Sequence, residues 1–268
     1  MNRSHILEGK RAVVFGAGGS LGSAVAKEFA AEDAEVFLAD RSKAPLDEVA
    51  RQIKEAGGTA HAAIVDALDI IAVDRYIDGI EQRAGHIDIE FTAVGPRVTE
   101  FGNGKLAVDL TIDEFMVPVN TMLKAQFIAA RSVARHMIRR QSGVIIFVTG
   151  SNARGHNEGA SAIGTAFGAI ETFMENFAYE ISRHGVRAVC LRTTANVDSR
   201  AIQETLEPLA TALKTTEEEV IAMITNANFK KVGAKTSDTA KLAVLLASDR
   251  VRMITGTVVN STAGAGLD

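Results

Sequence analysis

The chain has 268 residues, 47% hydrophobic and 23% charged, which is enough for one large α/β domain or two small ones. Its net charge of −4 excludes a polycationic nucleic-acid binder, and no apolar run reaches the ~18 residues that a membrane span needs, so we expect neither partner. The single cysteine, Cys190, excludes an internal disulfide and a thiolate metal cluster and indicates a reducing compartment, so we expect a cytoplasmic protein.

Short apolar runs alternate with helical patterns along the whole chain. Apolar runs of four to eight residues predict strands, and apolar residues recurring every three or four positions predict helices. In chain order the predicted elements are strand Arg11–Phe15, helix Ser20–Ala31, strand Glu35–Ala39, helix Leu46–Ala56, strand His61–Val65, helix Ile70–Arg83, strand Ile87–Val94, helix Thr111–Arg140, strand Val144–Thr149, helix Ala160–Arg183, strand Val186–Leu191, helices Ala201–Phe229 and Thr239–Ala247, and strand Thr257–Asn260.

The alternation of strands and helices predicts an α/β fold with a mostly parallel, seven-stranded sheet covered by helices on both faces. Residues 144–149 are continuously apolar, as in a strand buried on both faces. Thr111 and Glu114 form a capping-box pattern, and Pro118 should kink the helix that they open. We expect one domain over residues 1–268, with residues 192–235 as a substrate cap over the carboxyl edge of the sheet, where ligands bind in such folds.

A glycine-rich turn follows the first predicted strand. Gly16, Gly18 and Gly22 would let the backbone approach a pyrophosphate, and the next helix offers its N-terminal N–H groups to the phosphates. Asp40 ends the second strand, where its carboxylate can accept hydrogen bonds from both ribose hydroxyls. That carboxylate would repel a 2′-phosphate, so NAD is favoured over NADP, although Arg41 beside it partly opposes this preference.

With these motifs the chain resembles the short-chain dehydrogenase/reductase superfamily over its full length. The resemblance rests on residues 14–22 and 38–42, Val65-Asp66, Gly85-His-Ile-Asp88, His136-Met-Ile with 143–146, Glu180 with Gly185-Val-Arg187, and Leu246-Ala-Ser-Asp249 with Ile254-Thr-Gly256. It implies a single, doubly wound Rossmann-type domain, an oxidoreductase and a homo-oligomer, either a dimer or a tetramer, formed through the two long helices. The cofactor-binding residues that the turn and the resemblance together predict are Gly16, Gly18, Ser20, Leu21, Gly22, Asp40, Arg41, Asp66, Ala67, Val94, Gly95 and Ser199.

The same resemblance implies a catalytic Asn, Ser, Tyr and Lys, and here the sequence departs from the family. Counting from the surrounding motifs, these positions fall on Met122, Gly150, Ile163 and Phe167. None of these side chains exchanges protons, so we expect no tyrosine-dependent carbonyl or alcohol chemistry. A proton source other than the tyrosine is one alternative, and a pseudoenzyme that serves as a non-catalytic subunit or sensor is another.

The loop of residues 151–158 supplies a further alternative. It follows the central strand and contains Ser151 and His156, whose residue types could support a non-redox or cofactor-free enzyme. The histidines lack the spacing of metal ligands, so we expect no metal site.

Overall fold

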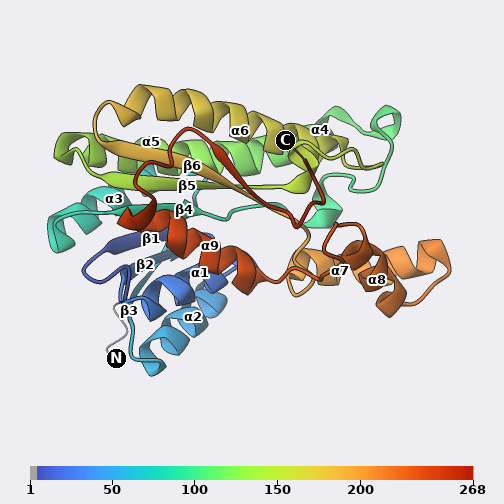
Figure 1. The fold of residues 1–268 in the computed structure, drawn as a ribbon, viewed down its shortest axis with the longest axis horizontal. Helices are drawn as coiled ribbons and strands as arrows, with labels where there is room; N and C mark the ends of the chain where they lie inside the picture. Colours follow the sequence, from blue (N-terminus) through green and yellow to red (C-terminus); the bar gives the residue numbers. More distant parts are fainter. Residues whose placement is uncertain (1–4, 268) are drawn as a thin grey trace.

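A seven-stranded sheet runs through the middle of the computed structural model, which describes residues 5–267 (Figure 1). Every neighbouring pair of strands is parallel, and the order is β3-β2-β1-β4-β5-β6-β7. This confirms the predicted fold class. The order reverses between β1 and β4, and the carboxyl ends of these strands therefore border the crevice in which ligands bind in open α/β sheets. The strands are β1 Arg11–Phe15, β2 Glu35–Asp40, β3 Thr59–Ile64, β4 Ile89–Thr92, β5 Gly143–Gly150, β6 Val186–Thr193 and β7 Val258–Ser261.

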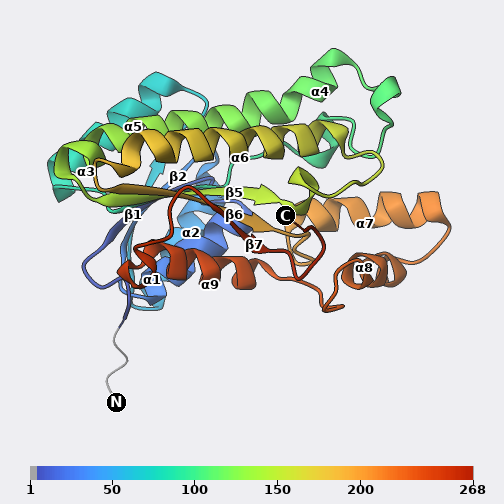
Figure 2. The same ribbon diagram turned by 45° about the horizontal axis from the view of Figure 1, so that its top comes forward.

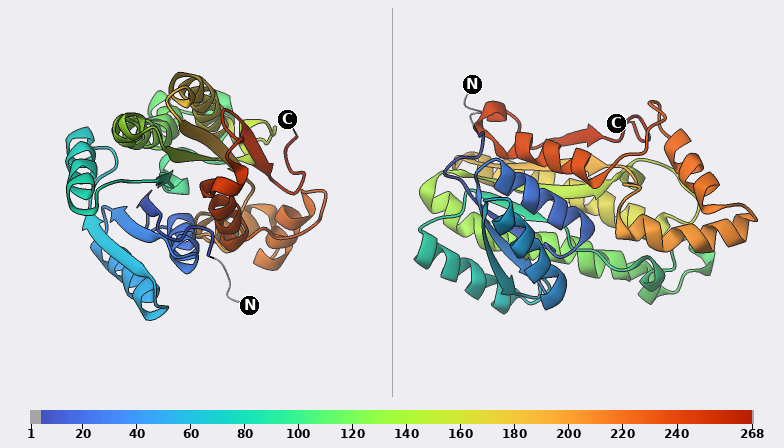
Figure 3. Two further views of the ribbon diagram at one scale, coloured as in Figure 1. Left: turned by 60° about the vertical axis from the view of Figure 1, so that its left-hand side comes forward. Right: turned by 90° about the horizontal axis from the view of Figure 1, so that it is seen from below.

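Helices cover both faces of the sheet, as the views in Figures 2 and 3 show. One face packs against α1, α2 and α9, and the other against α3, α5 and α6, which gives two separate apolar cores. Within residues 5–267 no helix has the length and apolar character needed to cross a membrane. The bounds are α1 Ser20–Ala31, α2 Lys43–Glu55, α3 Ile70–Ala84, α4 Ile112–Pro118, α5 Lys124–Arg140, α6 Ser161–Ser182, α7 Arg200–Leu213, α8 Glu217–Asn226 and α9 Thr236–Ala247.

Most predicted elements are found within a few residues of their expected ends. The main difference among the strands is β4, which spans four residues where the sequence predicted Ile87–Val94. Asp88, just before it, still bonds to both neighbouring strands: its N–H donates to the Arg11 carbonyl at 2.8 Å, and its carbonyl accepts from the Val144 N–H at 2.9 Å. The central strand β5 is buried from Val144 to Thr149, as its continuous apolar sequence predicted.

The predicted long helix from Thr111 to Arg140 is interrupted near its start. The capping box is present, because the Thr111 hydroxyl accepts from the Glu114 N–H and the Glu114 carboxylate accepts from the Thr111 N–H. The helix α4 then ends at Pro118, and a π-helical turn over Val119–Leu123 precedes α5. Proline lacks the N–H that an α-helix requires, and the chain accommodates this by changing its hydrogen-bond pattern after Pro118.

The prediction of one helix over Ala201–Phe229 is wrong. Lys214 adopts a left-handed conformation with φ of 53°, and Thr216 caps a new helix by accepting a hydrogen bond from the Glu219 N–H. The result is a pair of helices, α7 and α8, that lies beyond the carboxyl edge of the sheet (Figures 1 and 3). Leu206, Ala210 and Val220 form a small core between them that is separate from the two main cores.

A glutamine side chain completes the hydrogen bonding of the central strand. β4 pairs with β5 only as far as Ile146, which leaves the backbone of Val148 without a neighbouring strand on that side. Gln126, a buried residue of α5, donates to the Val148 carbonyl and accepts from the Val148 N–H, both at 3.0 Å. Its amide group thus replaces one residue of a strand and ties α5 to the end of β5.

Candidate cofactor and substrate site

The glycine-rich turn lies between β1 and α1 and requires glycine at two positions. Gly16 has φ of 74°, and a Cβ atom there would lie 2.5 Å from the carbonyl oxygen of Ala93. A Cβ atom on Gly22 would lie 2.2 Å from the carbonyl oxygen of Gly16. Both distances are far below van der Waals contact, so the turn keeps its shape only with glycine. The backbone left open by these residues, at the start of a helix, fits the approach of a dinucleotide pyrophosphate.

Asp40 ends β2 and is fixed against the same turn. Its Oδ2 accepts a hydrogen bond from the Gly18 N–H at 3.0 Å, and its Oδ1 accepts from the Ser42 N–H at 2.9 Å. A Cβ atom on Gly18 would lie 3.1 Å from Oδ2, so glycine at this position lets the carboxylate approach the turn. Arg41 is exposed beside it. The arrangement holds a carboxylate at the place that the sequence predicted for a ribose contact.

The remaining predicted cofactor-binding residues follow the carboxyl ends of other strands. Asp66, which follows β3, is exposed and accepts a hydrogen bond from the Leu68 N–H, and Ala67 is buried. Val94 and Gly95 follow β4. Because all these strands are parallel, the residues that follow them lie along the same edge of the sheet as the glycine turn.

Two predicted cofactor-binding residues, Ser20 and Ser199, have hydroxyls that accept hydrogen bonds from the first turn of α7. Ser20 and Leu21 begin α1, and Ser20 Oγ accepts a hydrogen bond from the backbone N–H of Arg200, at 2.9 Å. Ser199 precedes α7 as its N-cap, and its hydroxyl accepts from the Ile202 N–H at 3.4 Å. The hydroxyls of Ser20 and Ser199 therefore both accept hydrogen bonds from backbone N–H groups in the first turn of α7.

Three of the four residues at the expected catalytic positions, Met122, Gly150 and Phe167, take part in close contacts that involve a glycine. A Cβ atom on Gly150 would lie 2.7 Å from Cε2 of Phe167, so the aromatic ring occupies the space of any side chain at position 150. A Cβ atom on Gly95 would lie 3.6 Å from Cε of Met122. Ile163 lies one turn before Phe167 on α6 and is half-buried. The side chains of Met122, Ile163 and Phe167 therefore give this part of the carboxyl edge an apolar surface.

A buried polar cluster that the sequence analysis missed lies beside Gly150. Glu171 of α6 and Arg192 of β6, both 1% exposed, form a two-point ion pair with distances of 2.8 and 2.9 Å. The Thr149 hydroxyl also donates to Glu171, at 2.9 Å, and the Arg154 guanidinium lies 3.7 Å from the same carboxylate. The available signal was an arginine within an apolar strand and a glutamate on the apolar face of a helix, because such charges are buried only in pairs.

Two further titratable groups are buried close to these elements. Burial raises the pKa of Glu90 on β4 to about 8, and its carboxyl group accepts a hydrogen bond from the Thr92 hydroxyl at 2.5 Å. Burial likewise raises the pKa of the Cys190 thiol to about 12, so the thiol stays protonated at neutral pH. Cys190 is a free cysteine and contacts the Thr149 hydroxyl, with Sγ at 3.4 Å.

The loop after β5 does not bring its serine and histidine together. Ser151 begins a short 3-10 turn, and its carbonyl accepts hydrogen bonds from the N–H groups of Arg154 and Gly155. His156 is exposed, and among residues 5–267 no hydrogen bond joins its ring to the Ser151 hydroxyl. The same part of the chain contains no group of three His, Cys, Asp or Glu side chains arranged to hold a metal ion.

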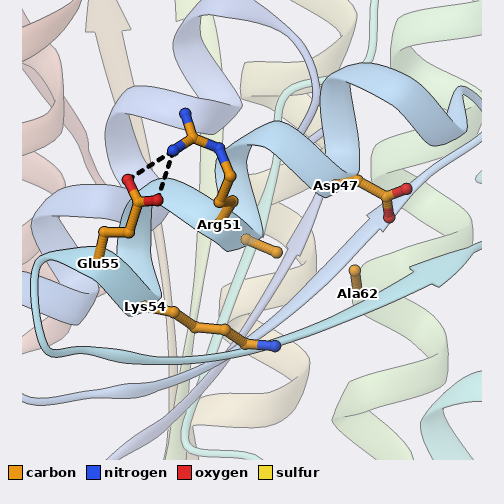
Figure 4. A pocket seen from close by; sticks show the side chains of 6 residues that line it. Asp47, Arg51, Lys54, Glu55 and Ala62 are labelled. Atoms are coloured by element: carbon orange, nitrogen blue, oxygen red, sulfur yellow. Dashed lines mark hydrogen bonds and ion pairs between the residues drawn. The ribbon is translucent and has the colours of Figure 1, made fainter.

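One surface pocket contains none of the residues predicted to bind a cofactor. It is a depression of about 570 Å³ between α2 and β3, lined by Asp47, Arg51, Lys54 and Glu55 (Figure 4). Arg51 pairs with Glu55 across one helical turn. We therefore place the functional site at the carboxyl edge, where the glycine turn lies.

A parallel, doubly wound sheet with a glycine turn after its first strand defines a protein of the dinucleotide-binding α/β class. Comparison with known families is more specific, because the model of the short chain dehydrogenase family matches residues 10–210. The chain therefore belongs to the short chain dehydrogenase family, as the sequence motifs predicted.

Individual relatives differ in substrate and cofactor. "Short chain aldehyde dehydrogenase 1" of Euphorbia lathyris is 26% identical over 265 residues, which cover 93% of this chain and 85% of the relative. Among solved structures, the actinorhodin polyketide ketoreductase with NADPH matches with a TM-score of 0.88 and 19% identity, covering 97% of this chain and 98% of the other. The 7α-hydroxysteroid dehydrogenase complexed with NADH and 7-oxo glycochenodeoxycholic acid has a TM-score of 0.84 and 21% identity, covering 100% and 99%. The two structures confirm the fold and carry different cofactors.

Proposed function

We propose that this chain binds NAD(H) at the carboxyl edge and does not use the tyrosine-dependent carbonyl chemistry of its family. The observation that carries the proposal is the contact of Phe167 with Gly150, which places an aromatic ring where the resemblance implies a lysine and leaves no room for a serine side chain. Met122 against Gly95 extends the apolar surface. None of these groups donates or accepts a proton.

The preference for NAD over NADP rests on Asp40. Its carboxylate is fixed by the N–H groups of Gly18 and Ser42, so it cannot swing away from a ribose bound at the end of β2. A 2′-phosphate at that place would face a fixed negative charge at close range. The exposed Arg41 next to Asp40 carries a positive charge that would attract a 2′-phosphate and so opposes this preference.

A bound nicotinamide would supply hydride transfer. The residues of this chain would then orient the cofactor and exclude water, because Met122, Ile163 and Phe167 present apolar surface and no acid. A hydride acceptor that is already cationic, such as an iminium carbon, needs no proton from the protein, since the new C–H bond neutralises it. A carbonyl acceptor would lack the positioned acid that typically contributes 10²–10⁴ in rate.

Titration calorimetry with NAD, NADH, NADP and NADPH tests the binding step. We expect the NAD pair to bind and Asp40→Ala to weaken that binding, and failure of all four dinucleotides at millimolar concentration would end the proposal. The redox step is tested by NADH oxidation with a panel of iminium and carbonyl substrates. Turnover that survives Tyr76→Phe and Tyr179→Phe supports a tyrosine-independent site. If the wild type reduces ordinary ketones and either variant loses this activity, the proposal is contradicted.

Binding without turnover on any substrate would favour the sensor or non-catalytic subunit. Turnover that needs no dinucleotide and is lost in Ser151→Ala would favour the cofactor-free enzyme with the 151–158 loop. Among the described residues no hydrogen bond joins Ser151 to the exposed His156, so this alternative has no support from hydrogen bonding.

The proposal includes a homo-oligomer, a dimer or tetramer, in the cytoplasm. Phe127 of α5 is 42% exposed, and its ring lies 5.5 Å from that of Phe173 on α6, so an aromatic ring lies at the surface of the two long helices. Phe173 itself packs inward on Phe147 of β5, at 5.7 Å. Phe173 also stacks on Phe177 at 5.3 Å. Light scattering should report more than one subunit, and Phe127→Asp should reduce the assembly to smaller species.

A further inference from the structure

Ser20 takes part in a contact that links the glycine turn to the cap, residues 192–235. Its hydroxyl accepts a hydrogen bond from the backbone N–H of Arg200, at 2.9 Å. Ser20 is the first residue of α1 and Arg200 is the first residue of α7. The two helices therefore meet at their N-terminal ends, although 180 residues separate them in the chain.

The meeting point coincides with the place where the proposed function puts the diphosphate. The first N–H groups of α1 are unpaired within the helix and attract an anion. The N–H of Arg200 is an unpaired group of the same kind on α7, and the Ser20 hydroxyl satisfies it. A diphosphate at the start of α1 would lie beside this hydrogen bond, and its oxygens would compete with the Ser20 hydroxyl for one donor, the Arg200 N–H.

The rest of the cap is held from the opposite side. Asp198 accepts hydrogen bonds from the Thr236 N–H and hydroxyl, at 2.8 and 3.0 Å, and the Val197 N–H donates to the Ala234 carbonyl at 2.9 Å. These bonds fix the beginning of the cap to the start of α9. The helices α7 and α8 share their own small apolar core, so they can move together without opening the core of the sheet.

We propose that Ser20 is a positioning residue that latches α7 against the glycine turn while no dinucleotide is bound, so that cofactor entry must break the Ser20–Arg200 hydrogen bond. The inference rests on the proposed dinucleotide site and adds a cost to binding there, since a latched state that excludes the ligand lowers its apparent affinity. The serine hydroxyl, which the sequence analysis placed among the cofactor ligands, thus acts on the cap.

Hydrogen–deuterium exchange on the free protein tests the latch without any ligand. Ser20→Ala should speed exchange in residues 200–213 and leave the sheet unchanged. Ser23→Ala is the matched control, because the Ser23 hydroxyl donates to the Ser20 carbonyl inside α1 and has no contact with α7 among the hydrogen bonds of the described residues. Ser20→Thr keeps the hydroxyl and should behave as the wild type. Equal exchange of α7 in Ser20→Ala and wild type would refute the latch.

Calorimetry with NADH then separates a latch from a direct ligand. Loss of one neutral hydrogen bond from the free state should tighten NADH binding by about 2- to 12-fold in Ser20→Ala. Weaker binding would mean that the hydroxyl contacts the cofactor, and an unchanged Kd would mean that it does neither, so both results overturn the proposal. If the wild type binds no dinucleotide, the proposed function fails, while the exchange experiment still decides whether Ser20 holds α7.

Discussion

The contact between Gly150 and Phe167 predicts a strong energetic coupling between these two positions. In Gly150→Ala the new methyl carbon would lie 2.7 Å from Cε2 of the ring, against the ~3.5–4.0 Å of a normal carbon contact, so the ring must retreat by about 1 Å. Overpacking of this kind costs roughly 1–3 kcal/mol. The backbone itself does not oppose alanine, because Gly150 has φ of −119° and ψ of 167°, an extended conformation.

The double-mutant cycle separates this clash from other effects. Once Phe167→Ala has removed the ring, Gly150→Ala should cost nothing and should gain about 0.4–1 kcal/mol from the reduced entropy of the unfolded chain. The expected coupling is therefore about 2 kcal/mol, within the range known for residues in contact. Urea denaturation of the four proteins measures it. The change in the free energy of unfolding caused by Gly150→Ala is compared in wild type and in Phe167→Ala. If the two changes agree within about 0.5 kcal/mol, the packing argument is refuted, and with it the position of the ring in the site.

Other perturbations report on the buried charges and the turn. Since burial raises the pKa of Glu90 from 4.5 to about 8, its contribution to stability is complete below pH 4.5 and is lost as the pH rises through 8. Wild type should lose roughly 3–5 kcal/mol across that window, while urea midpoints of Glu90→Gln should stay flat. Glu171→Ala leaves the buried Arg192 without its two-point partner and should cost about 3–5 kcal/mol by urea denaturation; a loss below 1 kcal/mol would contradict the pairing. Gly22→Ala should abolish NADH binding in calorimetry, because its Cβ meets the Gly16 carbonyl at 2.2 Å, and retained binding would show that the turn is not the cofactor site.

The elements of this fold were largely predictable because they depend on local patterns. The apolar run at 144–149, the capping box at Thr111 and the glycine turn before Ser20 all act within a few residues of the chain. The break between α7 and α8 was not predicted, because Lys214 carries no left-handed preference of the kind that glycine has, and Thr215-Thr216 reads as an ordinary polar stretch.

Contacts between distant segments were not predictable from one sequence. Glu171 and Arg192 come from a helix and a strand, and nothing in their local spacing indicates that they meet. The same holds for Ser20 and Arg200, whose bond depends on where the cap settles. The contact of Asp40 with the glycine turn is different, because the end of a strand and the turn after its parallel neighbour share one edge of the sheet.

The amide of Gln126 has a mechanical consequence for the crevice. Because that side chain takes the place of a missing neighbour of Val148, the end of β5 is anchored to α5 and does not rely on β4 for these hydrogen bonds. We therefore expect a displacement of the segment after β4, on binding of a bulky ligand, to leave the backbone at Gly150 in place.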